Sequence, residues 1–366
     1  MFKSINFEIS GICNAKCPYC VTGSLNLNKI FKNNHPFIEV KKFEKAIDYI
    51  LYNKMFDPES SLIALYNWGE PFLHPEFDKI VEILNYRNIK FQISTNASKI
   101  PKLSASTSLK NLKSLSFSMS GFSQDSYNKI HGFNFELIKK NIIEILNTFK
   151  FRKYKGITTI LYHVYQFNIG EYKAALSFAK NHNINIWPYY AGFNNYENTI
   201  KYLNKKLSYD LLEKASKDLI LYYIDELLSK KPLNYRCSQF DVLLVDEYCN
   251  LLTCCALPKG NQSYSFGNLF ELDLENIHNY KVSQKECFNC QKLHFDYWVG
   301  NIQASKFLIS SEFHIGFWNK FRNILFYIKN NQGLAQKSWS VFKTVGFKGM
   351  LKKIYNNISN IIYRGY

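Results

Sequence analysis

The chain has 366 residues, of which 46% are hydrophobic, and a formal net charge of +17. This length suits one large domain with a smaller one, no stretch approaches the roughly 20 apolar residues of a membrane-spanning helix, and the lack of a signal peptide predicts a cytoplasmic protein. The charge indicates no nucleic-acid partner, because the first 300 residues show no basic stripe combined with a base-stacking motif.

Short apolar segments alternate with helix-like segments from the N-terminus to about residue 195. Apolar residues at helical spacing indicate a helix at 40–52, for example. Strands alternating with helices predict βα units around a parallel sheet. We therefore predict an α/β fold in which residues 1–200 form an open, partial (β/α)6 TIM-like barrel. The expected strands are 7–10, 62–66, 90–94, 114–118, 156–165 and 183–189, and the expected helices are 40–52, 75–85, 135–148 and 170–181.

Three cysteines follow the first expected strand on a loop. Cys13, Cys17 and Cys20 have the spacing Cys-x-x-x-Cys-x-x-Cys. In a reducing cytoplasm cysteines seldom form disulfides, so metal binding is the better interpretation. Three thiolates on one loop can ligate three irons of a 4Fe–4S cluster and leave the fourth iron open to a small molecule. A zinc site built from two or three of these thiols is the alternative.

This spacing resembles the signature of the radical S-adenosylmethionine (SAM) superfamily, and the resemblance covers about residues 4–195. After the second strand, Asn67-Trp68-Gly69-Glu70-Pro71 is similar to the family's Gly-Gly-Glu-Pro motif, with Trp68 in place of the first Gly. In that family the glutamate and nearby carbonyls hold the amino group of the methionine moiety. An ammonium needs acceptors, and a turn containing Gly and Pro exposes them. The resemblance thus assigns cofactor binding to Gly69, Glu70 and Pro71.

Later strand ends extend the resemblance. Ser94-Thr95-Asn96-Ala97 looks like the family's Thr-Asn-Gly segment, and residues 116–121 resemble Ser-Ile-Asp-Gly, with Ser120 where Asp is common. Tyr19 stands where the family places an aromatic ring against the adenine. These strand ends face the mouth of the sheet, where α/β folds bind ligands. The resemblance therefore adds Tyr19, Asn96, Ser118 and Ser120 to the cofactor-binding residues.

The catalytic residues are not identified by these motifs. A serine at a strand end is more often a turn residue. His131 and His163 are acid–base candidates by residue type only, and a lone histidine is more often structural.

Six of the nine cysteines lie in residues 236–300, after a helical linker at 201–235. Their order resembles the auxiliary-cluster domain of SPASM and Twitch enzymes, in which a Cys precedes Gly-x-x-x-x-Cys, Gly-Asn and Cys-x-x-Cys. Cys249 stands where Gly is usual. No cysteine follows the last pair, so the resemblance implies one auxiliary 4Fe–4S cluster in a small α+β module, closest to the Twitch variant. The implied ligands are Cys237, Cys254, Cys287 and Cys290.

Two alternatives remain at this second cluster. Cys249 or Cys255 could replace Cys254 as a ligand. A structural zinc ion could replace the iron–sulfur cluster, because four thiolates also suit zinc.

Residues 301–366 form a basic, aromatic tail with ten Lys and Arg against one acidic residue, Glu312. Apolar residues recur at three- and four-residue steps between 345 and 361, which predicts a helical tail. An interfacial helix on the inner face of a membrane, a cap packed on the barrel and a partner-docking segment are the alternatives.

The resemblance implies a radical SAM enzyme of the oxidoreductase type that cleaves SAM. We expect it to abstract hydrogen from a small, carbohydrate-like molecule, which it oxidises or rearranges. A flavodoxin or ferredoxin is the expected one-electron donor. Modification of a peptide or protein side chain is the first alternative. A non-catalytic, zinc-binding adaptor docked at a membrane is the alternative from another class.

Overall fold

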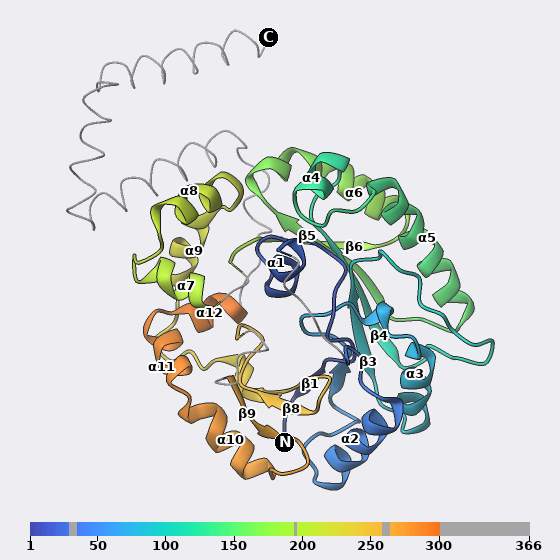
Figure 1. Cartoon of the computed structure of the whole chain (residues 1–366). Helices are drawn as coiled ribbons and strands as arrows, with labels where there is room; N and C mark the ends of the chain where they lie inside the picture. Colours follow the sequence, from blue (N-terminus) through green and yellow to red (C-terminus); the bar gives the residue numbers. More distant parts are fainter. Residues whose placement is uncertain (29–34, 194–195, 258–263, 301–366) are drawn as a thin grey trace, which may run out of the picture.

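The computed structural model describes residues 1–28, 35–193, 196–257 and 264–300 (Figure 1). Its centre is a nine-stranded sheet in the order β6-β5-β4-β3-β2-β1-β7-β8-β9. All neighbours from β6 to β7 are parallel, whereas β8 and β9 are antiparallel. The expected α/β fold with an open, partial barrel is therefore confirmed. The strands are β1 Ser4–Phe7, β2 Leu62–Ala64, β3 Phe91–Thr95, β4 Leu112–Met119, β5 Ile157–Val164, β6 Asn185–Tyr190, β7 Val242–Val245, β8 Asn250–Leu252 and β9 Ser265–Asn268.

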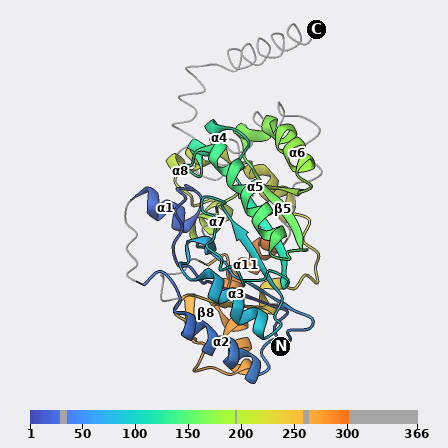
Figure 2. The same ribbon diagram turned by 90° about the vertical axis from the view of Figure 1, so that its right-hand side faces the viewer.

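Helices connect the parallel strands and cover the outer face of the sheet. Figure 2 shows α2, α3 and α5 side by side over this face. Each turns an apolar side to the sheet; in α2 the buried residues are Phe43, Ala46, Ile47 and Ile50. The helices of the barrel are α1 Val21–Leu27, α2 Val40–Tyr52, η1 Pro71–Leu73, α3 Phe77–Tyr86, α4 Gln124–Lys129, α5 Phe135–Phe151, η2 Gln166–Glu171 and α6 Tyr172–Asn181.

The remaining helices close a ring in the view of Figure 1, opposite the strands β3–β5. They are α7 Tyr196–Leu203, α8 Tyr209–Asp218, α9 Leu221–Leu228, η3 Ser238–Asp241, α10 Leu274–Ser283, α11 Lys285–Lys292 and α12 Phe295–Gly300. The sequence predicts a helical linker at 201–235. The chain instead breaks after α7, where Lys205 has a positive φ of 62°, and again between α8 and α9, where Leu219 is extended.

The segment 236–300 continues the same sheet. Strand β7 pairs in parallel with β1, in the register Ser4↔Val242 to Phe7↔Val245. The first strand was expected at 7–10, but β1 ends at Phe7, the last residue paired with β7. None of the described helices is long and apolar enough to cross a lipid bilayer. The predicted helical tail at 301–366 lies outside the described residues.

Candidate active site

The three cysteines of the first motif lie on the wall of one cavity with about 1270 Å³ of empty space. Helix α1 is hydrogen-bonded to the loop that carries these cysteines. Its Asn26 side chain donates to the carbonyls of Cys13 at 2.6 Å and Ala15 at 2.8 Å. Gly23 permits a close approach, because a Cβ there would lie 2.5 Å from the backbone nitrogen of Cys17. The loop is therefore fixed with its thiols facing the cavity.

These thiols suit a metal cluster in their chemistry. Burial raises the pKa of Cys13 to about 12, and it also raises the pKa values of Cys17 and Cys20. The thiols therefore keep their protons in the chain without metal, and bound iron would displace those protons. Three soft thiolates on one loop match the donor set of an iron–sulfur cluster.

Glu70 joins the loop after β2 to the end of β3. Its Oε1 accepts from Phe72 N at 3.1 Å and from Thr95 Oγ1 at 2.6 Å, and its Oε2 accepts from Asn96 N at 2.7 Å. A carboxylate accepts about four hydrogen bonds, so one position remains for a ligand. Burial raises the pKa of Glu70 to about 7, although these hydrogen bonds oppose the shift.

Asn96 connects this carboxylate to the cysteine loop. Its side chain donates to Asn14 Oδ1 at 3.1 Å and to Cys13 Sγ at 3.5 Å. Gly69, Glu70 and Asn96 all line the same cavity as the thiols. Pro71, by contrast, is buried at the start of η1 and does not line the cavity.

Glu8 is a buried residue that the sequence reasoning missed. Its carboxylate accepts from three consecutive backbone N–H groups, those of Asn67 at 3.3 Å, Trp68 at 2.8 Å and Gly69 at 2.8 Å. A Cβ at Gly69 would lie 1.7 Å from the carbonyl oxygen of Ser10. The loop thus packs tightly on the segment after β1. The only available signal was an acidic residue within the apolar first strand that the sequence predicts.

This anchor also explains why Trp68 can replace the family's first glycine. Only the backbone N–H of Trp68 takes part in the contact with Glu8. The indole is buried instead of occupying the cavity wall.

A second polar group in the cavity comes from three adjacent strands. Ser118 Oγ on β4 lies 3.1 Å from His163 Nε2 on β5, and the Tyr189 hydroxyl on β6 hydrogen-bonds to the same nitrogen. His163 and Tyr189 are register partners. Burial lowers the pKa of His163 to about 4, so its imidazole is neutral near pH 7.

Two further candidates, His131 and Ser120, differ in their position relative to the cavity. His131 lines the cavity, and its Nδ1 is buried without a hydrogen-bond partner among the described residues. Burial, and to a smaller extent His163, lowers the pKa of His131 to about 3. Ser120 is fully buried and does not line the cavity.

The helices after the barrel complete the cavity. Tyr19 lines it and donates its hydroxyl to Asp218 Oδ2, at the end of α8, at 2.6 Å. Trp298 on α12 lines it from the C-terminal segment and is 5% exposed. Its ring packs so closely on Gly192 that a Cβ there would lie 2.2 Å from two ring carbons. Sequence reasoning missed Trp298, because its approach depends on the tertiary fold.

The cavity wall is aromatic and almost without charge. In the described part of the chain, no Lys, Arg or Asp lines it, and Glu70 is its one carboxylate. The aromatic wall consists of Tyr19, Tyr66, Tyr165, Tyr189, Tyr190, Phe193 and Trp298.

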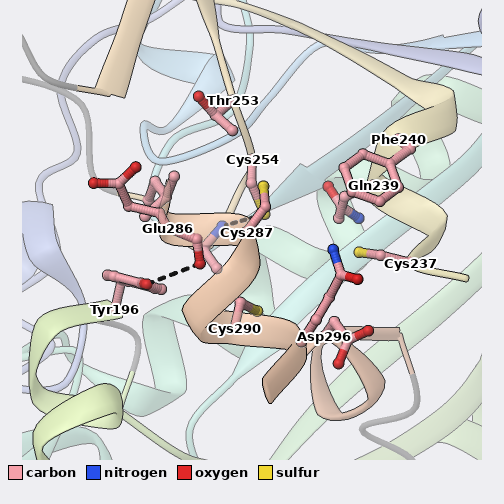
Figure 3. A pocket seen from close by; sticks show the side chains of 13 residues that line it. Tyr196, Cys237, Gln239, Phe240, Thr253, Cys254, Glu286, Cys287, Cys290 and Asp296 are labelled. Carbon is pink, nitrogen blue, oxygen red and sulfur yellow. Dashed lines mark hydrogen bonds between the residues drawn. The ribbon is translucent and has the colours of Figure 1, made fainter. Parts of the chain in front are cut away.

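Four of the C-terminal cysteines line a separate cavity (Figure 3). Cys237 precedes η3, Cys254 follows β8, and Cys287 and Cys290 lie on α11. Over the described ranges, no three His, Cys, Asp or Glu side chains already share a position for one metal ion. Binding of a cluster at either cysteine set therefore requires the thiols to adjust around it.

The two other cysteines of this segment have different surroundings. Cys249 is fully buried in the apolar core, in the turn between β7 and β8. Its φ of 65° lies in the left-handed region that favours glycine. Cys255 does not line the cavity. Its hydrogen bond to Cys254 is the main reason why the pKa of Cys254 is lowered to about 7.

Comparisons with known proteins agree with this architecture. The family model described as Radical SAM superfamily matches residues 7–179. The solved structure of Streptococcus suis SuiB bound to precursor peptide SuiA shares 13% identity, covers 85% of this chain and 76% of its own, and has a TM-score of 0.52. Native anSMEcpe with bound AdoMet shares 16% identity, covers 90% of this chain and 100% of its own, and has a TM-score of 0.50.

A third solved structure, BtrN in complex with AdoMet and 2-DOIA, shares 15% identity, covers 84% of this chain and 92% of its own, and has a TM-score of 0.36. That score is too low to support an argument. No curated protein matches this sequence. At these identities the structural matches establish the fold alone.

Proposed function

We propose that this chain, in which residues 7–179 form a radical SAM domain, cleaves SAM reductively and oxidises a neutral, hydroxyl-bearing small molecule. The observation that carries this proposal is the shared cavity. The thiols of Cys13, Cys17 and Cys20, the Glu70 loop and the Ser118–His163–Tyr189 group all face it. The cofactor site and a hydrogen-bonding substrate site would therefore adjoin each other in one cavity.

The domain family implies a 4Fe–4S cluster and SAM. When bound, the cluster supplies one electron to SAM, which yields a 5′-deoxyadenosyl radical able to abstract hydrogen. In our proposal the three thiols hold the cluster, and Glu70 accepts from the amino group of SAM through its remaining lone pair. Asn96 fixes the position of Glu70 relative to Cys13.

The charge of the cavity supports a neutral substrate. SAM carries its own ammonium and sulfonium to balance its carboxylate. A phosphate or carboxylate on the substrate would need a cation from the protein, and neither Lys nor Arg lines the described wall. Aromatic faces with a few hydrogen-bonding groups suit a hydroxylated, uncharged molecule instead.

In our proposal His163 accepts the proton in such an oxidation. A hydroxylated carbon that has lost a hydrogen atom becomes a carbonyl when the hydroxyl loses its proton and one electron leaves. His163 Nε2 lies within hydrogen-bond distance of two hydroxyl groups and is neutral near pH 7. An auxiliary cluster at the four C-terminal cysteines is the electron acceptor that we propose.

Modification of a peptide side chain is the second candidate. It is supported by the similarity in fold to SuiB, which was solved with its precursor peptide. Substrate-dependent formation of 5′-deoxyadenosine separates the two candidates. We expect stimulation by neutral polyols and sugars rather than by unstructured peptides.

The enzyme and adaptor interpretations are separated by anaerobic reconstitution with iron and sulfide. We expect visible absorption from iron–sulfur clusters, which zinc lacks, and 5′-deoxyadenosine after addition of SAM and a reductant. The Cys17→Ala variant is the control and should form none. Undiminished 5′-deoxyadenosine from that variant would overturn the proposal.

A further inference from the structure

Lys281, near the end of α10, is 1% exposed. Its Nζ donates to the carbonyl of Val242 at 2.8 Å and to the carbonyl of Thr253 at 2.9 Å. Thr253 directly precedes Cys254, and both line the four-cysteine cavity. The ammonium therefore lies behind the wall of that cavity, where it links β7 to the segment after β8.

An ammonium in this position needs a negative charge nearby. Lys281 is buried beside the cysteines, and its backbone carbonyl accepts from the Sγ of Cys287 at 3.5 Å. No carboxylate forms an ion pair with Lys281 in the part of the chain that the structure describes. Isolated buried charges are costly unless they are paired. Backbone carbonyls satisfy two of its three donors but supply no countercharge.

The carboxylates of the cavity wall do not fill this role. Asp296 forms an ion pair with Lys231, with Nζ to Oδ1 at 2.8 Å. Glu286 lines the cavity, and its nearest cation is the exposed Lys285 at 3.9 Å. Among the described residues, Lys281 is thus a cation beside the thiols that has no carboxylate in contact.

We propose that Lys281 is the countercharge of an anionic four-thiolate iron–sulfur cluster bound at Cys237, Cys254, Cys287 and Cys290. This inference rests on the auxiliary cluster of the proposed function. A cluster with four thiolates is anionic, and reduction by one electron makes it more so. A nearby ammonium stabilises the reduced form more than the oxidised form, so Lys281 raises the reduction potential. Such an effect suits a cluster that accepts electrons.

The test uses the full-length chain with Cys13, Cys17 and Cys20 changed to Ala, so that only the auxiliary site can bind iron. In this background, Lys281→Gln removes the charge but keeps a donor for the carbonyls. Lys281→Arg keeps the charge. Glu286→Gln is a control of opposite sign, because it removes a negative charge from the cavity wall. Iron content and the midpoint potential, from a redox titration followed by electron paramagnetic resonance, are measured after anaerobic reconstitution.

We expect Lys281→Gln either to bind iron with a lower midpoint potential or to lose most of its iron, while Lys281→Arg stays close to the parent. Glu286→Gln should shift the potential upwards. Equal iron and potential in Lys281→Gln and the parent would overturn the proposal, as would equal losses in the Gln and Arg variants, which would indicate a structural role. A parent without iron would instead overturn the auxiliary cluster itself, and Lys281 would lose this role with it.

Discussion

Glu70 is a buried carboxyl whose protonation should control SAM binding. Its pKa is raised to about 7 in the chain without SAM, mainly by burial. The ionised form accepts hydrogen bonds from the amino group of SAM, whereas the protonated form loses acceptor capacity. Affinity should therefore rise as the pH increases through 7.

Equilibrium dialysis of SAM against the cluster-loaded chain across neutral pH measures this dependence. Glu70→Gln is the matched control, because it preserves the shape but cannot ionise. It should weaken binding by about tenfold or more, since hydrogen bonds to charged groups contribute roughly 1.5–3 kcal/mol. It should also remove the pH dependence. The same pH profile in the Gln variant would show that another group titrates.

Cys249 and Cys254 allow a comparison of two cysteines five positions apart. Cys254 lines the auxiliary cavity, whereas Cys249 is enclosed by the apolar core. Cys254→Ala should lose the auxiliary iron. Cys249→Ala should keep it and lower the free energy of unfolding by about 1 kcal/mol, as truncation of a small core residue does. Iron analysis and denaturant unfolding distinguish the two effects, and loss of iron from Cys249→Ala alone would reverse our assignment.

Among the elements, those with a strong local pattern could be predicted from the sequence. Helix α2 occupies 40–52 as expected, because its apolar residues fall on one face. Strand β7 likewise matches its apolar run Val242–Val245. Strand boundaries that depend on the pairing partner were harder to predict from the sequence, as the early end of β1 shows. The division of 202–230 into separate helices depends on the left-handed turn at Lys205, a residue with no preference for that conformation.

The same distinction applies to the site. Motif spacing placed the three cysteines and Glu70 at strand ends, and the fold brings them to one cavity. Glu8 and Trp298 could not be assigned, because their roles depend on contacts distant in the sequence. Glu8 contacts Trp68, 60 residues away, and Trp298 contacts Gly192, 106 residues away.

The loop after β2 can be tested as an element through Gly69. A Cβ at this position would lie 1.7 Å from the Ser10 carbonyl oxygen, so Gly69→Ala must displace the loop. Glu8 could then no longer hold all three N–H groups, and Glu70 would shift away from the cysteine loop. We expect binding of SAM to fall at least tenfold, which corresponds to about 1.4 kcal/mol.

Iron content provides the internal control for this variant. The cysteines themselves are unchanged, so both clusters should still assemble. If Gly69→Ala binds SAM normally, the loop does not position Glu70 as we describe. If it loses iron as well, the loop supports the cluster directly.

At the scale of the whole molecule, the two cysteine sites border the same apolar cluster. Cys17 and Tyr19 from the barrel, and Cys254 and Cys290 from the C-terminal segment, pack against the cluster that contains Trp298. Helix α12 thus contributes to the main cavity through Trp298 and to the auxiliary cavity through Asp296. The electron donor and the role of the tail at 301–366 stay predictions.

The total iron content tests the two-site arrangement. Seven cysteines lie in two separate cavities, three in one and four in the other. Two 4Fe–4S clusters would give about eight irons per chain, and the Cys13/Cys17/Cys20→Ala variant should keep about four. Changing Cys237, Cys287 and Cys290 to Ala should likewise leave about four irons and preserve SAM cleavage, because the barrel cysteines remain intact. One zinc and no iron in the first variant would make the C-terminal site structural. Loss of all iron in either variant would mean that neither site assembles without the other. The apolar cluster that both sites border would then explain this dependence.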